Sequence, residues 1–251
     1  MGDANNAGLP VVAKYRRVFL QRFAAMVALG AIGGLGALGT SQILFADALT
    51  KEQRAAMSPD QIIAAMKEGN DHFRRGYTKA RNYLNEARAS AAGQYPAAVV
   101  LSCIDSRAPA EVVLDLGIAD VFSARVAGNI ANDDILGSME FACKVAGAKV
   151  VVVMGHTACG AIKGAIDNVE LGNLTGLLAK IKPAVVATKY EGDRSAKNYT
   201  FVDAVAKTNV EMTLAEIRAR SSVLRELENA GIIKMVGAMY NLKTAVVQFY
   251  A

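Results

Sequence analysis

Two short clusters contain the residues best suited to chemistry: Cys103-Ile104-Asp105-Ser106-Arg107 and Gly155-His156-Thr157-Ala158-Cys159-Gly160. Together they hold two of the three cysteines and one of the two histidines of the chain. Two thiolates and one imidazole fill three of the four tetrahedral positions that Zn²⁺ prefers. Three permanent ligands leave the fourth position to water or to an exchangeable carboxylate such as Asp105. The clusters therefore predict a zinc site of the catalytic kind.

Each cluster follows an apolar run that has the composition of a buried strand. Residues 97–102 precede Cys103, and residues 150–154, which begin with four valines, precede His156. In open α/β sheets, functional residues gather at the carboxyl ends of parallel strands. Two neighbouring strands would therefore bring Cys103, His156 and Cys159 to the same edge of a sheet. A helix that begins after Cys159 would favour its thiolate form through the helix dipole.

From residue 97 onward, strand-like runs alternate with helical patterns. This alternation predicts an α/β fold with a mostly parallel central sheet flanked by helices. The expected strands cover residues 97–102, 121–126, 150–154, 232–240 and 244–249, with a tight turn around Asn241, and the expected helices cover residues 110–116, 135–146 and 208–230. The sequence contains no internal repeat that would suggest a solenoid.

An N-terminal helical arm is expected ahead of the sheet. Ser58 is a suitable N-cap, Pro59 suits the first helical position, and Gly76 suits the end of the helix. This helix contains His72, which we expect to be a surface or capping residue and not a metal ligand. The third cysteine, Cys143, lies within an expected helix and is predicted to be a small buried apolar residue.

Length and composition favour one globular domain with an N-terminal extension. The chain has 251 residues, of which 53% are hydrophobic and 20% charged, so it can bury a full core. The formal charge of +5 falls to +3 without residues 1–48, because that segment carries four basic and two acidic residues. No basic stripe with interleaved aromatic residues remains, so nucleic acid is not an expected partner.

Residues 1–48 have the pattern of a cleaved export signal. Arg16 and Arg17 precede Val18-Phe19-Leu20 in a twin-arginine-like arrangement, and an uncharged stretch covers residues 23–46. Ala46 and Ala48 occupy the small-residue positions of a cleavage site. We therefore predict export to the periplasm, with residues 49–251 as the catalytic domain and no stable membrane contact after cleavage.

The alternative for this segment is an uncleaved membrane anchor through residues 23–46, which are numerous enough to span a bilayer. Five glycines between Gly30 and Gly39 favour the signal, because glycine is a poor helix former. An oxidising compartment would drive free cysteines toward disulfides. Metal loaded before export would protect Cys103 and Cys159 as zinc thiolates.

At the two clusters the chain resembles the β-class carbonic anhydrases, whose signatures are Cys-(Ser/Ala)-Asp-Ser-Arg and Gly-His-x-x-Cys-Gly. The resemblance extends over residues 58–250 and includes three more segments. These are Gly93-Gln94-Tyr95-Pro96, Arg125-Val126-Ala127-Gly128-Asn129 and Glu140-Phe141-Ala142. It implies a β-carbonic anhydrase-like fold and the zinc-dependent reversible hydration of CO₂ to bicarbonate and a proton.

The resemblance also assigns roles within the site. Cys103, His156 and Cys159 would hold zinc, and a zinc-bound hydroxide would attack CO₂. Asp105 would compete for the fourth position, Arg107 would hold it off the metal, and the released carboxylate would orient the hydroxide. The substrate-binding residues would be Gln94, which comes from the partner subunit of a homodimer or a dimer of dimers, together with Gly128 and Asn129.

Several alternatives remain open at this point. Relatives with this fold hydrolyse carbon disulfide or carbonyl sulfide, and a non-catalytic zinc-storing or redox-sensing module would use the same cysteines. Asp105 and Arg107 could be an ordinary helix-capping ion pair, and Gln94 could be a solvated turn residue. Three departures from the family pattern, at Ile104, Ala108 and Phe141, affect the shape of the pocket. The chain has no tryptophan, so the regulatory bicarbonate site of some members is not expected.

Overall fold

The computed structural model describes residues 48–250. The predicted export signal at residues 1–48 lies outside the described residues except for Ala48. Within the described part of the chain, no helix is both long enough and apolar enough to cross a lipid bilayer.

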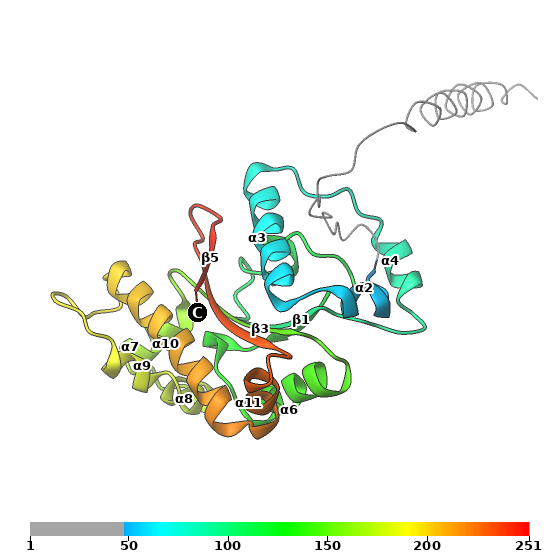
Figure 1. Cartoon of the computed structure of the whole chain (residues 1–251). Helices are drawn as coiled ribbons and strands as arrows, with labels where there is room; N and C mark the ends of the chain where they lie inside the picture. The colour runs from blue at the N-terminus through cyan, green and yellow to red at the C-terminus, as the bar shows by residue number, and fades with distance from the viewer. Residues whose placement is uncertain (1–47, 251) are drawn as a thin grey trace, which may run out of the picture. The chain divides into compact units, whose positions relative to one another are not determined.

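A single sheet of five strands forms the centre of the described residues, in the order β2-β1-β3-β4-β5 (Figure 1). The strands are β1 (Ala98–Ser102), β2 (Val121–Arg125), β3 (Val150–His156), β4 (Lys234–Tyr240) and β5 (Val247–Tyr250). The first four are mutually parallel, and β5 runs antiparallel to β4. The predicted α/β fold with a mostly parallel sheet is confirmed.

The carboxyl ends of β1 and β3 lie at the same edge of the sheet, and β3 continues two residues beyond the end of β1, to His156. Ser102 of β1 lies opposite Met154 of β3 on one side and opposite Arg125 of β2 on the other. Every residue of β1 and β3 is buried, as expected for strands that are covered on both faces. This register fixes where the chain leaves the sheet after each strand, and so places the two chemical clusters side by side.

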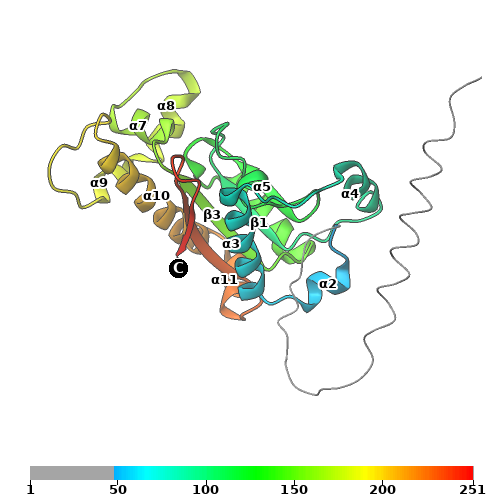
Figure 2. The same ribbon diagram turned by 90° about the horizontal axis from the view of Figure 1, so that it is seen from above.

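Helices cover both faces of the sheet (Figures 1 and 2). The α-helices are α2 (Lys51–Ala56), α3 (Pro59–Arg75), α4 (Tyr83–Ala89), α5 (Ala110–Val113), α6 (Asp133–Glu140), α7 (Gly160–Ile166), α8 (Gly172–Ala179), α9 (Lys182–Ala187), α10 (Tyr199–Arg220) and α11 (Ser222–Asn229). A 3₁₀ turn covers Ala127–Asn129 and a π-helical turn covers Phe141–Val145.

The core divides according to the faces of the sheet. Helices α3 and α5 pack with Val100 and Val152 on one face. Helices α6, α10 and α11 pack with Leu101 and Val153 on the other. A third apolar cluster joins α7, α8, α9 and the first half of α10 around Cys103 and Cys159. The functional clusters therefore lie where a strand edge meets a separate layer of helices.

The N-terminal arm forms as predicted. Ser58 caps α3 through a capping box with Gln61, and Gly76 ends the helix in the left-handed conformation at φ 71°. His72 is partly exposed, and its Nδ1 lies 3.3 Å from Oδ2 of Asp115. The histidine therefore links the arm to the turn after α5, and it does not lie with the predicted metal ligands.

The predicted helix over residues 208–230 is wrong in two respects. Helix α10 begins at Tyr199, where Asn198 caps it, and the chain breaks at Ser221 before α11. The Ser221 hydroxyl accepts from the backbone N–H of Leu224 and donates to Oε1 of Glu140 at 2.6 Å. A single serine thus ends one helix and caps the next, supported by a carboxylate from another part of the chain.

Smaller differences occur at other elements. The expected helix over residues 110–116 has only the four residues of α5, and the one over residues 135–146 begins at Asp133 and becomes π-helical at Phe141. The last strand begins at Val247, because the turn around Asn241 is longer than expected and its side chain accepts from two following backbone N–H groups. Helices α2, α4, α8 and α9 were not predicted, whereas α7 is the helix that was expected to begin after Cys159.

Candidate metal centre

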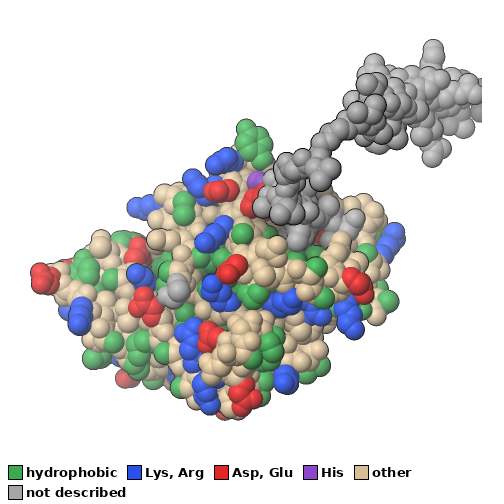
Figure 3. Space-filling model, in the orientation of Figure 1, with side chains coloured by type: hydrophobic (Ala, Val, Ile, Leu, Met, Phe, Trp, Pro, Cys, Tyr) green, Lys and Arg blue, Asp and Glu red, His purple; other side chains and the backbone are tan. Residues whose placement is uncertain are grey.

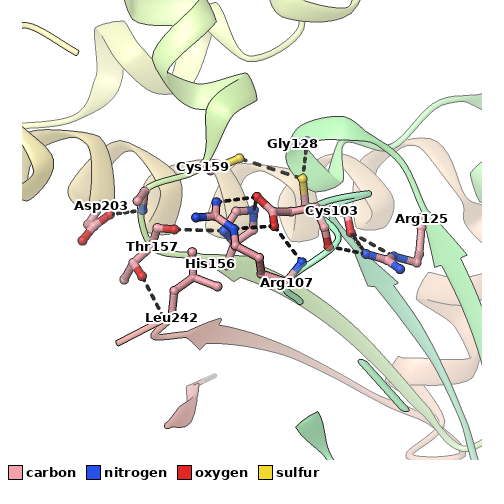
Figure 4. A network of polar contacts seen from close by, with 11 residues as sticks. Cys103, Arg107, Arg125, Gly128, His156, Thr157, Cys159, Asp203 and Leu242 are labelled. Atoms are coloured by element: carbon pink, nitrogen blue, oxygen red, sulfur yellow. Dashed lines mark hydrogen bonds and ion pairs between the residues drawn. The ribbon is translucent and has the colours of Figure 1, made fainter. Parts of the chain in front are cut away.

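The three predicted metal ligands come together in the structure. Cys103 follows β1, His156 is the last residue of β3, and Cys159 directly precedes α7. Their ligand atoms all lie within 4.8 Å of one another, and the two sulfurs are 3.9 Å apart (Figure 4). All three residues are buried. Among residues 48–250 they form the one group of this kind.

The hydrogen bonding of His156 suits a metal ligand. Its Nδ1 lies 2.9 Å from the carbonyl oxygen of Thr157, which can only accept, so Nδ1 carries the proton. This tautomer leaves a lone pair on Nε2, which is buried and has no hydrogen-bond partner among the described residues. An orphaned imidazole nitrogen beside two sulfurs fits a bound cation. The Thr157 carbonyl acts as the outer hydrogen-bond acceptor that metal-ligating histidines usually have.

The two sulfurs share charge unequally. A hydrogen bond from the Cys159 thiol lowers the pKa of Cys103, and the backbone N–H of Gly128 also points at this sulfur, at 3.4 Å. The same contact, together with burial, raises the pKa of Cys159. Thiolates and not thiols are metal ligands, so a metal ion bound by both cysteines would displace the protons that they still carry.

Asp105 and Arg107 form a two-pronged ion pair beside this group. Nε of Arg107 donates to Oδ1 at 2.9 Å, Nη2 donates to Oδ2 at 2.7 Å, and the Arg107 backbone N–H also donates to Oδ1. These bonds hold the pKa of Asp105 well below its usual range. The carboxylate does not cap a helix, since α5 begins after Pro109 without a side-chain cap.

Gly128 contacts the Cys103 sulfur, and its conformation favours glycine. Its φ is 69°, and an added Cβ would lie 2.5 Å from Cδ1 of Ile181. Its carbonyl accepts from Nδ2 of Asn209 at 2.8 Å, which fixes the peptide. The neighbouring Asn129 is buried, and its Nδ2 has no hydrogen-bond partner among the described residues. That amide remains available to a ligand.

Gln94 is the one predicted site residue that a single chain does not bring to the group. It is exposed and lies just before β1, whereas Cys103 follows the other end of the strand. Five strand residues span about 17 Å at ~3.3 Å each. The expectation that Gln94 enters the site from a partner subunit stays a prediction.

Three residues support the site in ways that were not predicted from the sequence. Asn209 donates to the Gly128 carbonyl. Arg125 donates to backbone carbonyls in the first cluster, and Asp203 accepts from the backbone N–H of Ala158 at 2.7 Å (Figure 4). Ala158 adopts φ 54°, so this bond stabilises an unfavourable backbone conformation between His156 and Cys159. Burial raises the pKa of Asp203. Of these three residues, only Arg125 belongs to a segment that carries the family resemblance.

Comparisons with known proteins agree with the geometry. A family model described as carbonic anhydrase matches residues 98–247. Carbonic anhydrase 2 of Mycobacterium tuberculosis is 35% identical over 191 residues, which cover 74% of this chain and 89% of the relative. Among solved structures, the β-carbonic anhydrase CafA of Aspergillus fumigatus is 26% identical with a TM-score of 0.59, over 76% of this chain and 89% of that one.

A second structural similarity concerns the fold. Two tetrameric β-carbonic anhydrases from Sordaria macrospora match with a TM-score of 0.58 and 22% identity, over 76% of this chain and 98% of the matched chain. The family model covers β1 through β4 and only the first residue of β5, and it therefore includes both chemical clusters.

Proposed function

This chain belongs to the β-class carbonic anhydrases, and from that membership we propose that it catalyses the reversible hydration of CO₂ to bicarbonate and a proton at a zinc ion. The observation that carries the proposal is the buried group of Cys103, His156 and Cys159, with their ligand atoms within 4.8 Å of one another and a nitrogen of His156 orphaned. When bound, zinc acidifies a coordinated water so that it becomes a nucleophile near neutral pH.

The donor set favours zinc over the hard cations. Thiolate and imidazole ligands suit zinc, whereas magnesium and calcium prefer oxygen. The tautomer of His156 is set by the Thr157 carbonyl, so Nε2 is ready to bind without a proton rearrangement. Two thiolates and a neutral imidazole balance the charge of a divalent cation. A further anion at the site then has to compete with water.

Asp105 and Arg107 are proposed to control that competition. The Asp105 carboxylate is an anion close to the metal ligands, and Arg107 holds both of its oxygens in the geometry expected for a guanidinium fork. Held in this way, the carboxylate is available to accept a hydrogen bond from the reacting water and to orient it toward CO₂. A lysine at position 107 could not hold both oxygens at once.

Gly128 and Asn129 are proposed to lie along the substrate. The Gly128 N–H points at the Cys103 sulfur, so CO₂ bound beside that sulfur would meet the adjacent buried amide of Asn129. An amide N–H donor there can bind an oxygen of CO₂ or bicarbonate. Gln94 of a partner subunit would supply a second donor. This arrangement would favour a small linear substrate over a larger one.

A homodimer or a dimer of dimers is proposed, with β2 at an interface. Strand β2 is an outer strand of the sheet, and its outer edge has no strand partner among the described residues. Hollows of about 720 and 490 Å³ lie beside it, the first lined in part by Phe122 and Phe141 and the second by Tyr83 and Ile118. Exposed apolar side chains along an open strand edge favour association with another chain.

Periplasmic export is proposed from the sequence of residues 1–48, which lie outside the described residues apart from Ala48.

On the face of the molecule in Figure 3, acidic and basic side chains are interspersed. Such a surface suits a protein that acts on small molecules, with no partner among nucleic acids.

Proton release on addition of CO₂ to the zinc-loaded full chain tests the proposed function. We expect rapid release that zinc removal abolishes and zinc addition restores. The same measurement with carbon disulfide or carbonyl sulfide identifies the related hydrolase if only those substrates react. Stoichiometric zinc without turnover of any of the three would favour the non-catalytic zinc-binding module.

A further inference from the structure

Arg125 supplies hydrogen bonds to a stretch of backbone that has just left the sheet. The ladder between β1 and β2 ends where the N–H of Val126 donates to the Ser102 carbonyl, at 3.1 Å. The next residue, Cys103, is buried, and a buried carbonyl without a partner costs free energy. Nε and Nη2 of Arg125 donate to the Cys103 carbonyl at 3.0 and 2.9 Å. The Arg125 side chain therefore supplies the hydrogen bonds that the Cys103 carbonyl would otherwise receive from a neighbouring strand.

The same guanidinium also reaches the second functional residue of the cluster. Nη2 of Arg125 donates to the Asp105 carbonyl at 2.6 Å (Figure 4). Asp105 is thus held at both ends by arginines: Arg107 binds its carboxylate and Arg125 binds its backbone. The Arg107 side chain is 58% exposed, whereas Arg125 is half-buried on β2. The more enclosed contact is the one on the backbone.

We propose that Arg125 is a positioning residue that sets the distance between the Cys103 sulfur and the Asp105 carboxylate, and so helps keep that carboxylate off the metal. The proposal rests on the proposed function only in taking the Cys103 group as a metal site. Because a planar guanidinium donates to two carbonyls at once, it fixes their separation. A lysine keeps the charge but lacks this fork. Arg107 then acts on a carboxylate whose backbone is already fixed.

Loss of the fork has a specific consequence. With only Arg107 left, the turn between Cys103 and Asp105 can relax, and the carboxylate can reach the fourth metal position. The Arg125→Lys variant should therefore bind its metal with Asp105 as an additional ligand more often than the native protein does. This change of ligand is a specific signature, because a general loss of stability would not produce it.

Cobalt(II) loaded into the full chain in place of zinc reports the ligand set through its visible absorption, without any need for CO₂ turnover. We expect Arg125→Lys to shift the cobalt spectrum relative to the native protein, because the Asp105 carboxylate joins the ligand set. In an Asp105→Asn background, adding Arg125→Lys should leave the spectrum unchanged, since the competing carboxylate is gone. Arg218→Lys is a matched control. Arg218 also forms a two-pronged contact, with Glu228, but it lies near the C-terminal end of α10 and contacts none of the predicted metal ligands.

Two outcomes would overturn the proposal. One is a native cobalt spectrum in Arg125→Lys. The other is a spectral shift of the same size whether residue 105 is Asp or Asn, which would indicate a general disturbance of the site. If Arg125→Lys fails to fold, Arg125→Gln, which retains one amide donor group, is measured in the same way. Absence of CO₂ hydration in the native protein would contradict the proposed function and leave these cobalt readouts intact.

Discussion

Nε2 of His156 lies 3.8 Å from Oδ2 of Asp105. The carboxylate is therefore next to the nitrogen that is proposed to bind the metal, although both of its oxygens are held by hydrogen bonds from Arg107. A small rotation of the Asp105 side chain would exchange one partner for the other. This closeness makes the carboxylate the most informative group to alter.

Asp105→Asn should keep its metal and lose most of its activity. The amide can no longer act as an anionic ligand, and it is a poorer hydrogen-bond acceptor for the reacting water. General acid–base groups typically contribute about 10²- to 10⁴-fold, so we expect at least a 100-fold loss in CO₂ hydration. Zinc content and hydration rate are measured together. Asp167→Asn, at an exposed carboxylate, is the control, and full activity in Asp105→Asn would contradict the assigned role.

Removal of a proposed ligand should remove the metal. Cys159→Ala deletes one of three donors, so zinc should fall well below one per chain and hydration should fall with it. Cys143→Ala is a matched control: Cys143 is also buried, burial raises the pKa of its thiol to about 12, and it lies outside the metal-binding group. Metal content is measured after dialysis. Stoichiometric zinc in Cys159→Ala would show that the ligand assignment is wrong.

Hydration activity should rise with pH through and above neutrality. Two thiolates neutralise a divalent cation, so a water on it is less acidic than on a zinc with three neutral histidines, where the pKa is about 7. Arg107 keeps the pKa of Asp105 far below this range, so the carboxylate stays charged and can still compete at lower pH. Initial rates across pH 6 to 9 in buffers of equal ionic strength provide the test. A flat profile would contradict the proposed competition.

The stability of the fold should also depend on pH, through Asp120. This carboxyl is buried just before β2, and burial raises its pKa to about 6, although the Gly117 N–H and nearby Arg81 oppose the shift. The folded state then holds this proton more tightly than the unfolded chain does. The associated stability is fully present below pH 4 and is lost as the pH rises through 6.

Asp120→Asn tests this sign. The amide oxygen can still accept from Gly117, and the variant has no charge to bury. Relative to the native protein, its free energy of unfolding should increase between pH 4 and pH 7 by about 2–3 kcal/mol, from ~1.4 kcal/mol per pKa unit. Urea denaturation of both proteins at the two pH values measures the difference. A difference that is independent of pH would contradict the prediction.

Export can be tested independently of the fold. Replacing Arg16 and Arg17 together by lysine should retain the protein in the cytoplasm, because a twin-arginine receptor distinguishes arginine from lysine. Cell fractionation measures the location and length of the product. Unchanged delivery of a mature form that begins near Leu49 would indicate the general secretory route. A full-length membrane-bound product would favour the anchor.

The clustering of Cys103, His156 and Cys159 could be predicted from the sequence, because these residues follow strongly apolar runs that become β1 and β3. The break at Ser221 could not, since it depends on Glu140, which lies 81 residues away in the sequence. No glycine or proline marks that position. The contacts of Arg125 with the Cys103 and Asp105 carbonyls could not be predicted either. Backbone carbonyls are present at every residue, so the sequence does not indicate which of them a side chain will bind. The place of Gln94 depends on a second chain.

The sequence separation of Cys103 and Cys159 has a consequence for how the protein matures. These two residues are 56 positions apart and meet only when β1 and β3 lie side by side. A nascent chain therefore cannot hold the metal with all of its ligands until the middle of the sheet has assembled. Thiol-reactive reagents applied during refolding would label both cysteines before that event and neither once metal is captured. The time at which both cysteines become protected therefore reports when β1 and β3 pair during folding.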